Sequence, residues 1–114
     1  MAKKKPAAVV PPQPPQIFEA TRGSMGRVTR GAQIDQAQAE ARRKAGEDVV
    51  VCGSDHHANR GLAGQIETGA NGTAKRCPPH LNEGPYALPH YQPDPRPPEG
   101  HTFYETSNRR ASVS

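Results

Sequence analysis

The sequence contains no tryptophan, and two phenylalanines and three tyrosines are its only aromatic residues among 114. Aliphatic side chains do not compensate, because hydrophobic residues make up only 32% of the chain. Large apolar side chains supply most of the burial that stabilises a fold. We therefore expect a modest core, and a domain of low intrinsic stability that a bound partner would stabilise.

Long hydrophobic runs and cysteine pairs are also missing. The basic run Lys3–Lys5 could begin a signal peptide, but the prolines between Pro11 and Pro15 interrupt the chain before any apolar stretch of useful length. No segment is long and apolar enough to cross a membrane. The two cysteines, Cys52 and Cys77, form no C-x-x-C pair. We expect neither a signal peptide, nor membrane insertion, nor a disulfide framework.

Proline and polar residues divide the chain. A proline-rich, basic segment opens it, and proline favours extended chain without internal hydrogen bonds. The last residues are polar, as in frayed termini. The sequence therefore predicts a tether without fixed structure at 1–23, a single small domain at 24–106 and a flexible tail at 107–114.

The formal charge of +4 is concentrated outside that domain. Lys3, Lys4, Lys5 and Arg22 all precede residue 24, where Glu19 is the only acidic residue. Residues 24–114 then carry 11 basic and 10 acidic residues, a net charge of +1. Long-range attraction to nucleic acid is weak at that charge, so any phosphate recognition must be local.

Hydrophobic periodicity predicts an α+β domain. Ile34, Ala37, Ala41 and Ala45 recur at helical spacing and predict a helix over Gln33–Ala45. The β-branched run in Asp48–Gly53 predicts a buried strand, and Ala58, Leu62 and Ile66 predict a second helix over His56–Thr68. Further short strands are expected at the following ranges: Gly23–Arg30, Thr73–Cys77, Leu88–Gln92 and Thr102–Thr106. The predicted order is two N-terminal helices around a short strand, then a small sheet of short strands and Pro-rich loops.

Three histidines in the last third of the chain, His80, His90 and His101, are the main functional signal. Imidazole is the side chain that gains or loses a proton near neutral pH. Cleavage of RNA without a metal ion needs a base for the 2′-hydroxyl, an acid for the leaving oxygen, and cations around the phosphate. The cations available are Lys75, Arg76 and Arg96. Tyr91 and Tyr104 can donate a hydrogen bond or stack on a base.

Two other interpretations of the histidines stay open. Cys77-x-x-His80, with His90 and His101, would offer one sulfur and three nitrogen ligands to zinc. Alternatively, the three histidines are structural and donate to backbone carbonyls of a proline-rich loop. The pair His56-His57, at the start of the predicted second helix, is interpreted as a surface or capping feature.

The ordering Pro78-Pro79-His80, Gly84-Pro85-Tyr86-Ala87-Leu88-Pro89-His90-Tyr91-Gln92 and Pro97-Pro98-Glu99-Gly100-His101-Thr102-Phe103-Tyr104 resembles C-terminal toxin modules of bacterial polymorphic toxin systems, the Rhs, contact-dependent and type VI effector type. The resemblance covers 48–106. Many such modules are small α+β ribonucleases of the barnase, EndoU, colicin and RelE-like group. It implies cleavage of a competitor's RNA after delivery by a specialised secretion system into the target-cell cytoplasm, and a cognate immunity protein.

On that basis the sequence predicts a monomeric ribonuclease that needs no cofactor. His80 and His101 are assigned as base and acid, Lys75 or Arg76 as the phosphate ligand, and His90 and Tyr104 as supporting donors. The alternatives are a metal-dependent nuclease, another nucleotide-directed toxin, or a non-enzymatic interaction module with a structural or zinc-bound histidine loop. A deaminase is disfavoured, because H-x-E and P-C-x-x-C are both absent.

Overall fold

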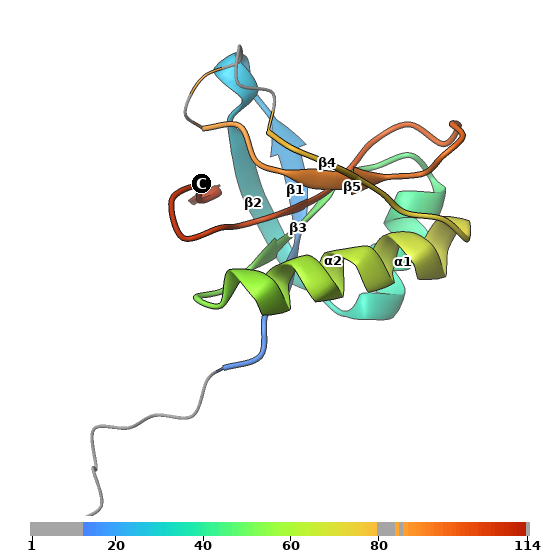
Figure 1. Ribbon diagram of the computed structural model, residues 1–114, viewed down its shortest axis with the longest axis horizontal. Helices are drawn as coiled ribbons and strands as arrows, with labels where there is room; N and C mark the ends of the chain where they lie inside the picture. The colour runs from blue at the N-terminus through green and yellow to red at the C-terminus, as the bar shows by residue number, and fades with distance from the viewer. Residues whose placement is uncertain (1–12, 80–83, 85, 114) are drawn as a thin grey trace, which may run out of the picture.

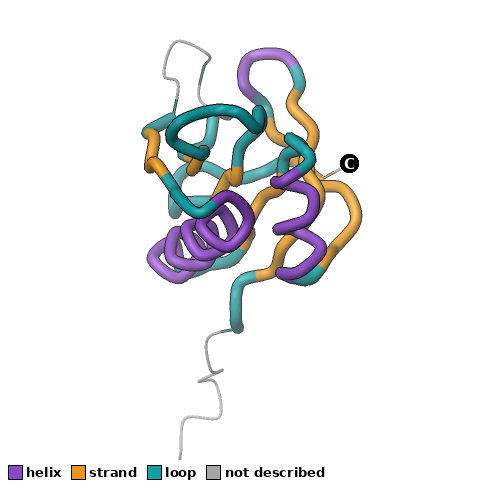
Figure 2. Tube along the Cα trace, turned by 90° about the vertical axis from the view of Figure 1, so that its right-hand side faces the viewer, coloured by secondary structure: helices purple, strands orange, loops and turns teal. Residues whose placement is uncertain are grey.

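The computed structural model describes residues 13–79, 84 and 86–113. A mixed seven-stranded sheet carries both helices on one face (Figures 1 and 2). The elements in chain order are β1 (Gln16–Arg22), the 3₁₀ turn η1 (Ser24–Gly26), β2 (Val28–Ile34), α1 (Gln36–Lys44), β3 (Val49–Cys52), α2 (His56–Asn71), β4 (Lys75–Cys77), β5 (His90–Gln92), β6 (Thr102–Tyr104) and β7 (Ser112–Val113). Within the described ranges, neither helix has the length and apolar composition needed to span a membrane.

The strands lie in the order β4-β5-β6-β3-β1-β2-β7. The pairs β3–β6 and β2–β7 are parallel, and the other neighbours are antiparallel. Strand β3 lies centrally, and all four of its residues are buried, as the run of β-branched residues predicts. Because β3 and β6 are adjacent and parallel, residues that come after both strands meet at one edge of the sheet.

The α+β class is confirmed, but the predicted layout with two helices first is wrong. Two strands precede α1, and β1 lies inside the segment assigned to the tether. Ile17 and Ala20 are buried, because β1 lies inside the sheet between β3 and β2 and these side chains join the core clusters on its two faces. Their partners come from distant parts of the chain, so the local sequence gives little sign of the strand. The rest of the predicted tether, residues 1–12, lies outside the described residues.

The predicted tail at 107–114 also contributes to the sheet. Ser112 and Val113 form β7, which pairs with Thr29 and Arg30 of β2. The backbone N–H of Ala111 donates to the carboxylate of Glu105, 2.8 Å away. The folded unit therefore extends beyond 24–106 at both ends.

Helix α1 buries a different face from the one predicted. Ala37, Ala41 and Ala45 are exposed, whereas Ala39 and Arg43 are fully buried. The Arg43 side chain forms an ion pair with Glu67 of α2, at 2.8 Å, and neither side chain is exposed. A charged side chain this deeply buried is stable when it is paired, so this ion pair decides which face of the helix points inward.

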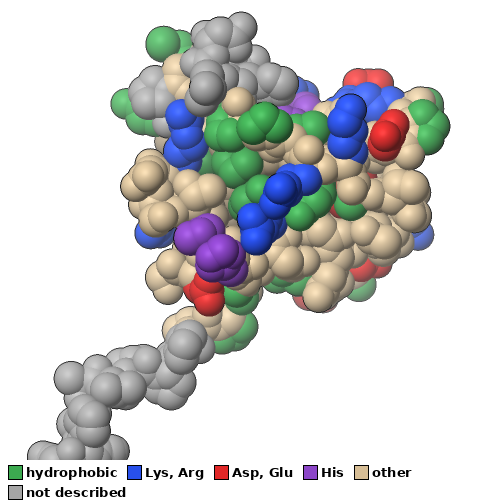
Figure 3. Space-filling model, in the orientation of Figure 1, with side chains coloured by type: hydrophobic (Ala, Val, Ile, Leu, Met, Phe, Trp, Pro, Cys, Tyr) green, Lys and Arg blue, Asp and Glu red, His purple; other side chains and the backbone are tan. Residues whose placement is uncertain are grey.

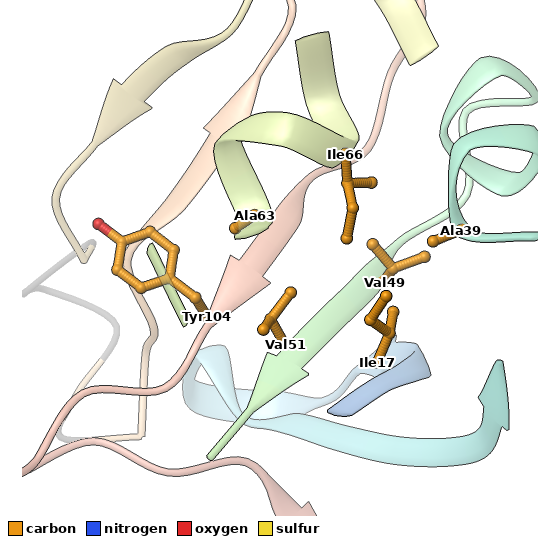
Figure 4. Close-up of a cluster of buried hydrophobic side chains, with 7 residues drawn as sticks. All are labelled: Ile17, Ala39, Val49, Val51, Ala63, Ile66 and Tyr104. Atoms are coloured by element: carbon orange, nitrogen blue, oxygen red, sulfur yellow. The ribbon is translucent and has the colours of Figure 1, made fainter. Parts of the chain in front are cut away.

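The core has one cluster on each face of the sheet. The cluster under the helices is drawn in Figure 4 and comprises Ile17, Ala39, Val49, Val51, Ala63, Ile66 and Tyr104. The cluster on the opposite face comprises Ala20, Val28, Val50, Cys52, Leu88 and Phe103. Alternate residues of β6 thus belong to opposite faces, which separates Tyr104 from Phe103.

Candidate functional site

A cleft of about 630 Å³ opens between the start of α2, strand β4 and the segment after β6. We call it the arginine cleft. Its lining residues come from chain segments far apart in sequence: His56, Arg60, Arg76, Cys77, Pro78, Pro79, Pro89, Tyr104, Thr106, Asn108 and Arg109. Figure 3 shows histidine and basic side chains bordering a hydrophobic surface on the side of the molecule that carries α2.

The first turn of α2 places two of these side chains. The helix begins after Asp55, whose carboxylate accepts hydrogen bonds from the backbone N–H groups of His57 and Ala58. His56 and Arg60 are four residues apart, and therefore lie on one face of the helix, which lines the cleft. His57 does not line the cleft, although its ring centroid is 4.2 Å from that of His56.

Strand β4 supplies Arg76 but not Lys75. Arg76 is the cross-strand partner of Tyr91, and Lys75 that of Gln92. Successive side chains of a strand point to opposite faces of the sheet. Arg76 lines the cleft, as does Cys77 at the end of the strand, whereas Lys75 does not, although the sequence nominated both Lys75 and Arg76 as phosphate ligands.

The third arginine, Arg109, is positioned by contacts that the sequence does not reveal. Its Nη1 donates to the carbonyl oxygens of Ala87, at 2.8 Å, and Gly84, at 3.3 Å. The buried carboxylate of Glu105 accepts from the backbone N–H groups of Gly53, at 3.2 Å, and Ala111, at 2.8 Å. Glu105 thus ties the turn before α2 to the segment that carries Arg109.

Tyr104 lies where β6 meets the cleft, and its hydroxyl points away from the other side chains of the helix-side cluster (Figure 4). Burial raises the pKa of this phenol, as does neighbouring Tyr91, while the charges of Arg76 and Arg60 oppose the shift. A phenol is already protonated at neutral pH, and a raised pKa leaves it so. Tyr104 can therefore donate a hydrogen bond in the cleft.

The charge of the cleft is uniform. Three arginines and one histidine line it, and none of the described lining residues carries a carboxylate. Guanidinium groups bind phosphate through paired, charge-assisted hydrogen bonds. The arrangement is suited to an anionic, phosphate-bearing ligand, and its donor set is not that of a magnesium site, which needs carboxylates.

His90 and His101 do come together, but on the opposite face of the sheet. Their ring centroids are 4.4 Å apart in an edge-to-face arrangement, and both contact Phe103. They border a pocket of about 150 Å³. His90 is 1% exposed and its Nδ1 lies 3.5 Å from the carbonyl oxygen of Leu88. A pair this buried, beside so small a pocket, is not open to an RNA strand.

The remaining nominated residues are dispersed. His80 lies outside the described residues. Tyr91 packs beside Tyr104, with ring centroids 5.8 Å apart, under α2. Arg96 donates to Glu99, Gln92 and the backbone of Gly100.

The proposed zinc ligands are also divided between the two sites. Cys77 lines the arginine cleft, whereas His90 and His101 border the small pocket on the other face. Within residues 13–79, 84 and 86–113, no group of three or more His, Cys, Asp or Glu side chains is placed to hold a metal ion. Cys52 and Cys77 are both free thiols.

Asp48 anchors His101 on the sheet. Its Oδ1 accepts from the backbone N–H of His101, at 2.8 Å, and its Oδ2 from Nε of Arg22, at 3.0 Å. Burial alone would raise the pKa of Asp48, but the hydrogen bonds from His101 and the charge of Arg22 outweigh burial and lower it. A lowered folded-state pKa adds stability above the unfolded pKa, near pH 4, that is lost as pH falls through the folded pKa.

Replacing Asp48 with asparagine should therefore lower the free energy of unfolding by about 1.5–3 kcal/mol at neutral pH, because it removes hydrogen bonds to a charged group. The difference from wild type should narrow as pH falls below about 4. Urea unfolding at neutral pH and at about pH 3 tests this, with exposed Asp94→Asn as control. A difference that stays constant over this pH range would contradict it.

Sequence reasoning did not nominate five polar members of the arginine cleft: His56, Arg60, Thr106, Asn108 and Arg109. The i, i+4 spacing of His56 and Arg60 was a usable signal, because it places an imidazole and a guanidinium on one helical face. Nothing local marks Asn108 and Arg109, whose position depends on Glu105 and on the loop around Gly84. Comparison of the chain with protein-family models, curated proteins and solved structures found no match.

Proposed function

We propose that the arginine cleft binds the phosphodiester backbone of RNA and that the protein cleaves RNA there without a metal ion. The observation that carries the proposal is the convergence of Arg60, Arg76 and Arg109 beside His56 and Tyr104. Guanidinium groups stabilise the charge that develops on a phosphate during transfer. The proposal moves the centre of reaction to this cleft and away from His101, which the sequence had assigned, with His80, as acid or base.

In the proposed reaction, the 2′-oxygen of a ribose forms a bond to the adjacent phosphorus, and the bond from phosphorus to the 5′-oxygen breaks. A base takes the proton of the 2′-hydroxyl, and an acid returns one to the 5′-oxygen. His56 is assigned one of these transfers, and Tyr104, whose phenol is neutral at physiological pH, donates a hydrogen bond to the phosphate or the leaving oxygen. His80 stays the sequence-based prediction for the second transfer.

The test is cleavage of total RNA and of tRNA by the purified protein, with and without EDTA. We expect cleavage that survives EDTA and falls about a hundredfold in Arg76→Gln, the size of effect seen when one transition-state donor is removed. Lys75→Gln is the matched control, since it removes the same charge one residue away but outside the cleft. Cleavage abolished by EDTA would favour a metal-dependent nuclease, and no cleavage by folded protein would favour a binding module.

The wider role proposed from the resemblance to polymorphic toxin modules is that of an antibacterial effector delivered into a target cell and held in check by an immunity protein. If RNA cleavage is its means of action, induced expression in a bacterium should arrest growth. Arg76→Gln should relieve the arrest and Lys75→Gln should not. Equal toxicity of both variants would show that the growth arrest does not depend on the arginine cleft.

A further inference from the structure

The three arginines of the cleft come from three separate segments of the chain and line the same cavity. Arg60 comes from α2, Arg76 from β4, and Arg109 from the segment after β6, and all three line one cleft. Proteins that track a nucleic-acid backbone instead extend their basic residues along a groove. The geometry here is that of a site for one or two phosphates.

The charge of the remaining surface supports a local site. Residues 13–114, which include β1, contain 12 basic and 11 acidic residues; without the three cleft arginines, nine basic residues face eleven acidic ones. A duplex is held mainly by cations distributed over many phosphates, and this balance provides no such surplus outside the cleft. Within residues 13–114, attraction for nucleic acid is therefore concentrated at the arginine cleft.

The size and the lining of the cleft match a single nucleotide. A volume of about 630 Å³ falls in the range of roughly 300–1,000 Å³ that is typical of small-molecule sites. Three proline rings, from Pro78, Pro79 and Pro89, line the cleft together with the His56 imidazole. Unpaired bases stack on aromatic rings, including histidine and tyrosine, and on guanidinium planes, and His56, Tyr104 and the three arginines supply these types here.

We propose that the arginine cleft admits one unpaired nucleotide of a single RNA strand and excludes nucleotides held in a duplex. This inference rests on the proposed RNA function. A base inside a duplex reaches such a cleft only after it has been unpaired and unstacked, which costs a few kcal/mol. Loops, bulges and single-stranded ends are then the substrate class, and RNA secondary structure sets the position of cleavage.

The experiment compares one RNA sequence in two states: a labelled single strand, and the same strand annealed to its complement. Cleavage is measured on both, and binding is measured in parallel with 2′-O-methyl versions, which lack the attacking hydroxyl. We expect cleavage of the single strand to be at least about tenfold faster than cleavage of the duplex, with the same preference in binding. Arg76→Gln should weaken binding of the single strand, and Lys75→Gln should not.

The two measurements separate the inference from the proposed function. Preferential, Arg76-dependent binding of the 2′-O-methyl single strand, without cleavage of its RNA counterpart, would uphold the inference and overturn the assignment as a ribonuclease. Equal cleavage or equal binding of single strand and duplex would overturn the inference while leaving RNA as the ligand. Failure of wild-type protein to bind either form would overturn both.

Discussion

Replacing His56 with alanine is expected to slow RNA cleavage by about 10²–10⁴-fold, the usual contribution of a positioned proton-transfer group. His56 is the only described histidine that lines the arginine cleft. The substitution removes the imidazole without disturbing the helix cap, because Asp55 makes its hydrogen bonds to the backbone of His57 and Ala58. The loss should therefore appear in kcat more than in KM.

His57→Ala provides the matched control. The two rings are adjacent, but His57 lies outside the cleft and its Nδ1 is 3.4 Å from Nη2 of Arg60. We expect it to retain most of the activity, with any change confined to the orientation of Arg60. The measurement is the rate of RNA cleavage by both variants, after circular dichroism has verified that each is folded. Equal losses in the two variants would remove His56 from the proposed mechanism.

The second large effect concerns the stability of the protein. Arg43→Ala is expected to lower the free energy of unfolding by about 3–5 kcal/mol, because it leaves the Glu67 carboxylate buried without its cation. Glu67 also accepts from the hydroxyl of Thr102, at 2.9 Å, and Nη1 of Arg43 donates to the carbonyl oxygens of Glu47 and Glu99, at 3.0 Å each. One ion pair thus connects both helices, β6 and the loop before it.

Urea unfolding measures this effect, with Lys44→Ala as control. Lys44 is the next residue of α1 and is exposed, so its removal should change stability by no more than about 0.5 kcal/mol. The double variant Arg43→Met, Glu67→Leu should recover much of the loss, since it removes both charges and refills the space. An Arg43→Ala variant as stable as Lys44→Ala would show that the pair contributes nothing.

Elements with strong local patterns could be predicted from the sequence. The β-branched run of β3 and the span of α2 both lie close to their predicted positions, because each carries its own periodicity and boundary residues. Strand β1 could not be predicted, since Ile17 and Ala20 are buried by residues that lie far along the chain, in the core clusters on the two faces of the sheet. The prediction of which face of α1 is buried was wrong for a related reason. Alanines occupy several of its faces, and Arg43 turns inward only because Glu67, far along the chain, is there to pair with it.

The residue types of the candidate site could be predicted from the sequence better than the places of those residues in the fold. The approach of His90 to His101 results from the pairing of β5 with β6, and the sequence identified both as unusual. Their burial on the face opposite Tyr104 depends on strand register, which the sequence did not reveal. The arginine cleft needs three distant segments to meet, so only the His56–Arg60 spacing and Arg76 were visible locally.

The two hydrogen bonds that Glu105 accepts from the backbone determine when the arginine cleft can form during synthesis of the chain. The Glu105 carboxylate accepts hydrogen bonds from the backbone N–H groups of Gly53 and Ala111. Arg109 lies in the short segment between Glu105 and Ala111. A growing chain emerges from the ribosome N-terminus first and folds as it is made. The helix that carries His56 and Arg60 is therefore available early, but the third guanidinium joins it only after translation has passed residue 109. A nascent chain that stops short of that point holds most of the sheet and has no complete arginine cleft.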